Sequence, residues 1–154
     1  MEKEALTPMP PTEKELREAY RTMTGLPSTT DNLACRLELV EALMTNAQSL
    51  PAAPILVWRE PEKPVAHRVL ELELIVGREA GNTGLSFSGD QLLSRRHFAI
   101  RNKDAEWILE DLQSRNGTAI NRTENKVKSE ALRDGDLIFA GNQVFAFLDQ
   151  GKVT

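Results

Sequence analysis

Residues 94–120 have the sequence SRRHFAIRNKDAEWILEDLQSRNGTAI, and this stretch decides the fold. It contains three short runs rich in apolar residues, with two polar turns between them. The runs are residues 98–101, 107–112 and 118–120, and the turns are residues 102–104 and 116–117. Short runs bounded by Asn, Asp and Gly are typical of β-strands joined by tight turns. The stretch therefore predicts consecutive strands with no helix between them.

The same pattern continues on both sides of this stretch. Residues 55–58 are an apolar run, residues 69–74 alternate between apolar and charged side chains, and further strands are expected at 137–140 and 144–148. Many short strands separated by regular turns indicate a β-sandwich and not a βαβ fold. We predict an all-β sandwich for this part of the chain.

The first 50 residues have a helical pattern instead. Residues 1–11 are polar, contain three prolines and are expected to form a disordered tail. Capping-box pairs, Thr12 with Glu15 and Ser28 with Asp31, predict two helix starts. The helix-spaced apolar residues of the second helix are Leu33, Leu37, Val40, Met44 and Ala47. The prediction is a short α-helical hairpin over residues 12–50.

Residues 51–64 contain four prolines and form a boundary that includes the possible first strand. Two short helices need a surface to pack on. That surface is the C-terminal domain, a second copy of the chain in a homo-oligomer, or a partner protein.

Composition excludes several classes of protein. The net charge of the 154 residues is −4, which argues against nucleic-acid binding, because that function usually needs a basic surface. The single cysteine, Cys35, excludes an internal disulfide and a cysteine-based zinc site, and we expect it to be a small apolar residue of a helix. There is no apolar signal segment or membrane-length run, so no membrane contact and a cytoplasmic location are expected, with a secreted effector as the alternative.

Three motifs follow predicted strand ends and place arginines in loops. They are Gly77-Arg78, Ser94-Arg95-Arg96-His97 and Ser114-Arg115-Asn116-Gly117-Thr118. Arginine presents a planar fork to two oxygens of a phosphate dianion, while hydroxyl and backbone N–H groups bind the remaining oxygens. An Asn side chain can pair with the N–H and C=O of a peptide. Because loops at one end of a sandwich converge, these motifs predict a phosphate-binding site.

The order and spacing of these motifs resemble the forkhead-associated (FHA) domain family over roughly residues 54–150. The stretch 77–97 is similar to the first motif of that family, 111–118 to the second and 132–138 to the third. The resemblance implies an eleven-stranded β-sandwich of the SMAD/FHA type that binds phosphothreonine peptides.

The same resemblance assigns roles to individual residues. It implies that Arg78 and Ser94 contact the phosphate, that Arg95 adds a second contact and that Asn116 holds the peptide main chain. Arg115 stands where many members have a small hydroxyl residue, which weakens its assignment as a phosphopeptide contact. The implied structural residues are Gly77, His97 and Gly117.

Several polar residues have a structural interpretation beside the functional one. His97 is expected to be structural and not a catalytic base, because no nucleophile or second base lies at useful spacing. Arg96 would face away from Arg95 in an extended segment, so an exposed role is as well supported as a binding role. The Asp134-Gly135-Asp136 sequence predicts a turn and not a calcium loop. Thr29 and Thr30 are expected to cap a helix, with regulatory phosphorylation sites as the alternative.

The sequence thus predicts an adaptor or signalling module, not an enzyme, that binds a phosphothreonine-containing protein in a Ser/Thr kinase pathway and needs no cofactor or metal. The alternative is a phosphate-independent structural or assembly subunit, such as a secretion-system scaffold or a homodimer, that uses the same sandwich.

Overall fold

The computed structural model describes residue 14 and residues 53–58, 66–122 and 124–149. Apart from Lys14, the hairpin predicted for residues 12–50 lies outside the described residues, as do Thr29, Thr30 and Cys35. The hairpin, the two regulatory sites and the homo-oligomer therefore stay predictions.

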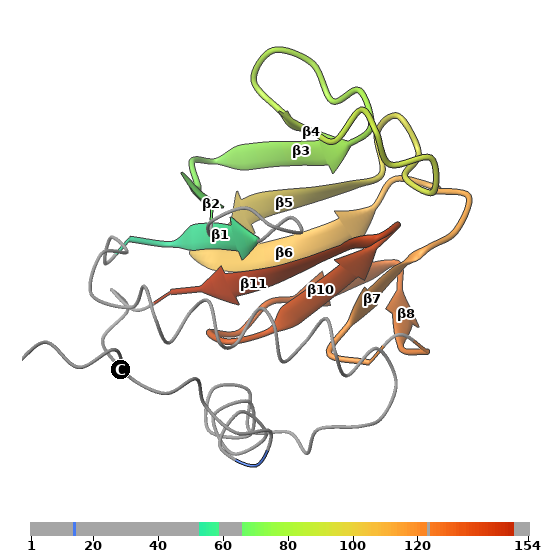
Figure 1. The fold of residues 1–154 in the computed structure, drawn as a ribbon. Coiled ribbons are helices and arrows are strands. Elements are labelled where there is room, and N and C mark those ends of the chain that lie inside the picture. The colour runs from blue at the N-terminus through green and yellow to red at the C-terminus, as the bar shows by residue number, and fades with distance from the viewer. Residues whose placement is uncertain (1–13, 15–52, 59–65, 123, 150–154) are drawn as a thin grey trace, which may run out of the picture.

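The described residues form eleven strands in two packed sheets (Figure 1). The strands are β1 (Ile55–Trp58), β2 (Ala66–Val69), β3 (Glu73–Gly77), β4 (Leu85–Ser86), β5 (Phe98–Lys103), β6 (Glu106–Asp111), β7 (Thr118–Ile120), β8 (Lys126–Val127), β9 (Ser129–Ala131), β10 (Leu137–Ala140) and β11 (Gln143–Leu148). The six-stranded sheet has the order β2-β1-β11-β10-β7-β8, and the five-stranded sheet has the order β4-β3-β5-β6-β9. The predicted β-sandwich is confirmed.

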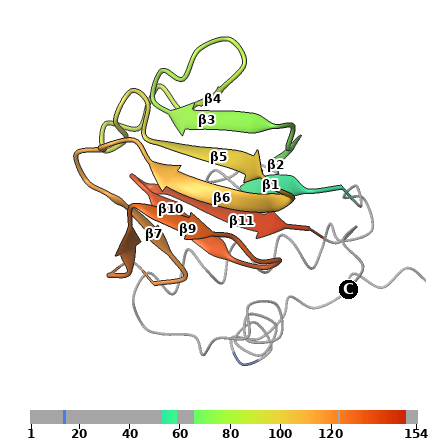
Figure 2. The ribbon, with the colours of Figure 1, turned by 180° about the vertical axis from the view of Figure 1, so that it is seen from behind.

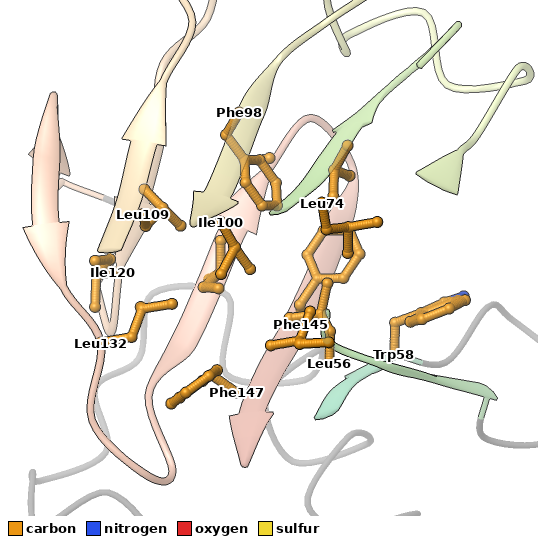
Figure 3. Close-up of a cluster of buried hydrophobic side chains, with 14 of the residues drawn as sticks. Leu56, Trp58, Leu74, Phe98, Ile100, Leu109, Ile120, Leu132, Phe145 and Phe147 are labelled. Carbon is orange, nitrogen blue, oxygen red and sulfur yellow. The ribbon is translucent and has the colours of Figure 1, made fainter. Parts of the chain in front are cut away.

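The core lies between the two sheets and consists of apolar side chains from both (Figure 3). Phe98 of β5 and Phe145 of β11 are fully buried, and their rings meet edge to face with centroids 5.7 Å apart. Trp58 and Phe87 extend this aromatic group, since their rings are 5.8 Å apart. Such edge-to-face pairs add to the free energy gained from burial alone, so the ring cluster holds the two sheets in one relative position.

Three predicted strands have the same bounds in the structure, namely β1, β7 and β10. The single strand predicted for residues 69–74 is wrong. The chain instead leaves the six-stranded sheet after Val69 and enters the five-stranded sheet at Glu73. The N–H of Leu70 donates to the carbonyl of Pro54 at this crossing, and Leu72 is exposed. Apolar and charged residues alternate from Val69 to Leu74 even though the chain crosses between the two sheets there. This alternation made the segment resemble a single strand.

The turn predicted at residues 102–104 begins two residues later in the structure. Strand β5 continues to Lys103, and the turn is formed by Asp104 and Ala105, which have φ values of 52° and 68°. Two successive positive φ values are typical of a type I′ hairpin, whose twist matches that of the flanking strands. Asp tolerates this conformation, whereas the sequence gives no reason to expect it of Ala.

Candidate phosphate-binding site

Three loops meet at one end of the sandwich: the β3–β4, β4–β5 and β6–β7 loops (Figures 1 and 2). They enclose a surface hollow with nine lining residues. These are Arg78, Gln91, Leu92, Leu93, Ser94, Arg95, Arg96, Arg115 and Asn116. All five residues that the sequence assigned to phosphopeptide binding therefore lie around one hollow.

The first loop is joined to the second by backbone contacts around Gly77. The N–H of Arg78 donates to the carbonyl of Ser94 over 2.9 Å, and the N–H of Glu79 donates to the carbonyl of Arg95 over 3.0 Å. A β-carbon at Gly77 would collide with the carbonyl oxygen of Arg95 and lie 2.8 Å from that of Ser94. Glycine is required here because two backbones approach closely, and this approach places Arg78 beside Ser94.

Ser94 also joins the second loop to the third. Its Oγ accepts a hydrogen bond of 2.9 Å from the backbone N–H of Arg115. Asn116 makes a second link, since its Nδ2 donates to the carbonyl of Leu92 over 2.9 Å. These two bonds join the loops, and neither of them uses the side-chain carbonyl of Asn116.

His97 is fully buried behind the hollow, where its ring joins the β4–β5 loop to the β6–β7 loop. Its Nδ1 accepts from the N–H of Ser94 at 3.0 Å, and its Nε2 lies 2.8 Å from the carbonyl of Gly117. An Nδ1 that accepts and an Nε2 that donates correspond to the neutral Nε2–H tautomer. Both ring nitrogens are thus engaged in backbone bonds, which is the arrangement that a structural role requires.

Asp111, at the end of β6, organises the loop that contains Arg115. One carboxylate oxygen accepts from the hydroxyls of Ser114 and Thr118 at 2.6 and 2.7 Å, and the other accepts from the N–H of Ser114 at 3.1 Å. Burial alone would raise the pKa of Asp111. The hydrogen bonds from Ser114 and Thr118 outweigh burial and hold the pKa below its ordinary value of 3.8.

Asp90 organises the approach to Ser94 from the other side. Its carboxylate accepts four hydrogen bonds of 2.8 to 3.1 Å from Leu92, Asn142 and Gln143, and thereby ties the β4–β5 loop to the turn between β10 and β11. Burial raises the pKa of Asp90, but these bonds lower it by more, so that it stays below 3.8. Neither Asp90 nor Asp111 was singled out as a site residue from the sequence, because their partners are distant residues or ordinary loop hydroxyls.

The hollow is strongly cationic. Four of its nine lining residues are arginines, and none of the nine is acidic. Arg95 makes a loose ion pair with Glu79 at 3.7 Å, in which both side chains are exposed. The Nε of Arg78 is buried and has no hydrogen-bond partner among the described residues. A buried unpaired donor is costly, by about 1–3 kcal/mol, and uncommon in folded proteins.

Arg96 also lines the hollow, beside Arg95. The prediction that the two side chains face opposite ways applied only to an extended segment. Residues 95 and 96 lie in a bend before β5 and not in extended backbone, so the two-residue alternation of a strand does not apply to them.

A second hollow adjoins the first and shares Leu92 and Asn116 with it. Its other lining residues are Gly117, Ala119, Lys126, Phe139, Gly141, Asn142, Gln143 and Val144. It mixes apolar side chains with amides and one lysine, so it is suited to a peptide side chain and not to a second phosphate.

Metal chemistry and membrane spanning have no counterpart in the part of the chain that the structure describes. No group of three His, Cys, Asp or Glu side chains there could hold a metal ion. No described helix has the length and apolar character needed to cross a membrane. Asp136 of the predicted turn accepts instead from Asn121 at 3.0 Å and from the N–H of Arg133 at 2.8 Å.

The described strands and loops define a two-sheet β-sandwich with a cationic hollow at one end. Residues 74–141 match the family model described as FHA domain, so this part of the chain is similar to that family. The resemblance proposed from the sequence is thereby confirmed. No curated protein matches the chain.

Solved structures agree with this family. The FHA domain of FhaA, solved in complex with the intracellular domain of Rv3910, is 28% identical, with a TM-score of 0.52 over 62% of this chain and 99% of that chain. A structure described as a study of phosphothreonine-dependent FHA domain interactions is 27% identical, with a TM-score of 0.52 over 62% and 96%. The FHA domain of CT664 from Chlamydia trachomatis, at 23% identity and a TM-score of 0.55 over 63% and 98%, shares the fold.

Proposed function

We propose that this protein binds phosphothreonine peptides and acts as an adaptor in a Ser/Thr kinase pathway. The observation that supports this most directly is the hollow lined by four arginines and no acidic residue, with Ser94 and Asn116 on its rim. The match to the FHA domain model and the similarity to a structure studied for phosphothreonine-dependent FHA domain interactions support the same function. FHA domains are interaction modules, and we propose that this chain is likewise not an enzyme.

In this proposal the phosphate dianion binds between Arg78, Ser94 and Arg95. The arginines supply charge-assisted hydrogen bonds, and the Ser94 hydroxyl donates to a third phosphate oxygen. The unpaired Nε of Arg78 gains a partner when an anion enters and the side chain adjusts. Arg115 and Arg96 add positive potential at the rim, which favours a doubly charged ligand over a singly charged one.

The peptide main chain is held by Asn116, whose side-chain carbonyl is not used in its bond to Leu92. From there the peptide extends over the second hollow, where Phe139 and Val144 receive a side chain close to the phosphothreonine. Main-chain hydrogen bonds supply affinity and the second hollow supplies sequence preference, as in other modes of extended-peptide recognition.

A phosphothreonine peptide library, assayed in parallel with its unphosphorylated form, tests the proposal. We expect binding that depends on the phosphate. In Arg78→Ala the affinity for the best peptide falls by about 2–5 kcal/mol, the range for losing one member of a desolvated charge pair. Arg122→Ala is the matched control, because Arg122 lies in an exposed turn outside the hollow, where its side chain forms an ion pair with the exposed Glu124 at 3.8 Å. It leaves the affinity unchanged.

Equal binding of phosphorylated and plain peptides, or an affinity that Arg78→Ala leaves unchanged, would contradict this function. Either result would favour the phosphate-independent assembly subunit that the sequence left open as the alternative.

A further inference from the structure

Three neighbouring strands of the six-stranded sheet are buried on both faces. All residues of β1 and β10 are buried, as are the last four of β11. In an antiparallel sheet with one face in water, polar and apolar residues alternate, whereas strands buried on both faces have continuous apolar runs. The sequences ILVW, LIFA and FAFL are continuous apolar runs of this second kind.

The strand register identifies the side chains that point away from the core. Ile55 pairs with Leu148, Val57 and Leu137 both pair with Ala146, and Phe139 pairs with Ala119. None of these belongs to the core cluster between the sheets, which contains their strand neighbours. Five of them form a continuous apolar surface, here called the outer face. Its residues are Ile55, Val57, Leu137, Ala146 and Leu148, and it stops short of Ala119 and Phe139, which line the second hollow.

This outer face is not exposed. Ile55 and Val57 have exposed fractions of 1% and 0%, although the second sheet packs only against the opposite side of their strand. The five-stranded sheet behaves differently, because Arg101 on its outward side bridges Glu73, at 2.6 Å, and Glu110. That sheet therefore has charged groups on its outward side, beside the buried Ile75 and Ala99, whereas the outer face of the six-stranded sheet is apolar and buried.

None of the described strands covers the outer face. The eleven strands account only for the inner side of this sheet. Outside the strands, the longest segment is the one that precedes Ile55.

We propose that residues 28–50 cover the outer face with the apolar stripe of the predicted second helix. A helix of that length spans roughly 35 Å, and its width of about 10 Å covers two to three strands spaced about 4.8 Å apart. The stripe residues Leu33, Leu37, Val40 and Met44 match an apolar surface, and the segment joins β1 directly at the edge of that surface. This inference concerns the opposite side of the sheet from the core and does not depend on phosphopeptide binding.

Thiol labelling of the full chain tests the proposal. Cys35→Ser removes the one native thiol. In that background Val57→Cys introduces a thiol on the outer face, and Val76→Cys introduces one into the core as a control for unfolding, since Val76 is fully buried in the core cluster. Native alkylation of both is expected to be slow.

Val40→Glu places a charge in the stripe, and the matched Ala42→Glu places the same charge on the opposite side of the predicted helix. We expect Val40→Glu to speed alkylation at the outer-face thiol by about tenfold or more, with little effect on the core thiol. Ala42→Glu changes neither rate. An outer-face thiol that reacts fast without Val40→Glu, or that responds equally to both charges, overturns the proposal.

If Val40→Glu speeds alkylation of both thiols equally, the charge has unfolded the domain. Hydrogen exchange of the unmodified chain then tests whether residues 28–50 cover the outer face. Docking predicts slow exchange of amides in residues 33–47 in a protein of monomeric mass. Exchange there as fast as in residues 1–11 overturns the proposal, and protection found only in a dimer assigns the outer face to a second copy of the chain.

Discussion

The backbone N–H of Arg115 donates to the Oγ of Ser94 over 2.9 Å, which joins two loops at the hydroxyl predicted to bind phosphate. A serine hydroxyl accepts hydrogen bonds and has one proton to donate. Because Oγ accepts from Arg115, its proton is left to point at a ligand oxygen. The bond that shapes the hollow thus also sets the direction in which Ser94 donates.

Ser94→Ala removes this acceptor and this donor together. We expect the affinity for a phosphothreonine peptide, measured by titration calorimetry, to fall by about 1–3 kcal/mol while the domain stays folded. Ser129→Ala, on an exposed strand at the edge of the five-stranded sheet, is the matched control and should bind like the unmodified protein. Full affinity in Ser94→Ala would remove Ser94 from the site.

Gly77→Ala tests the close approach of the first two loops. The added β-carbon collides with the carbonyl of Arg95, which is backbone and cannot rotate away. We expect unfolding in urea to show a loss of about 1–3 kcal/mol, the usual cost of overpacking, together with weaker phosphopeptide binding. At Gly89 an added β-carbon meets nothing within 4 Å, so Gly89→Ala should be tolerated, and similar behaviour of the two variants would refute the argument.

The lowered pKa of Asp111 predicts that the free energy of unfolding falls at acidic pH. Its pKa is lower in the folded protein than its ordinary value of 3.8, so the carboxylate stabilises the fold above that value. This contribution is lost as pH falls below about 4, through the lower pKa of the folded state. Urea unfolding at several pH values should show a fall in the free energy of unfolding there.

Asp111→Asn should be less stable at pH 7 by about 1–3 kcal/mol and less sensitive to acid, because it has no charge to lose. Asp104→Asn, in an exposed turn, is the control and should keep the acid dependence of the unmodified protein. An unchanged acid dependence in Asp111→Asn would show that another group causes it.

Asp90→Asn tests whether the β10–β11 turn supports the binding loop. The carboxylate accepts four hydrogen bonds, two of them from Asn142, and an amide can accept at only one of its two positions. We expect lower stability and faster amide exchange in residues 90–93, measured by mass spectrometry, with a modest loss of phosphopeptide affinity. Unchanged exchange in that loop would show that the turn does not support it.

Much of this fold follows from local sequence. Strands β1, β7 and β10 were predicted with their bounds because continuous apolar or β-branched runs ended at clear turn residues. Strands β4, β8 and β9 were missed, since strands of two or three residues in exposed surroundings have no hydrophobic period. Their existence depends on neighbours that only the folded chain supplies.

The candidate site likewise contains residues that local sequence predicts and residues that only the folded chain brings together. That the arginines, Ser94 and Asn116 lie around one hollow was predictable, because their motifs stand at loop positions of a β-sandwich. Asp90 was not, since its amide partners Asn142 and Gln143 lie 52 and 53 residues further along the chain. Residues that hold a loop in place are defined by the fold, whereas residues that face a ligand are defined by their own chemistry.

The buried Nε of Arg78 lowers the stability of the free domain, whereas the proposed phosphopeptide binding requires the same arginine. An apolar chain of similar length at this position has no unpaired donor, so Arg78→Met should raise the melting temperature of the free domain while it abolishes phosphopeptide binding. Selection for thermal stability alone would therefore replace Arg78 and disable the module. A library of this protein screened only for heat resistance should become enriched in chains that no longer bind phosphopeptides.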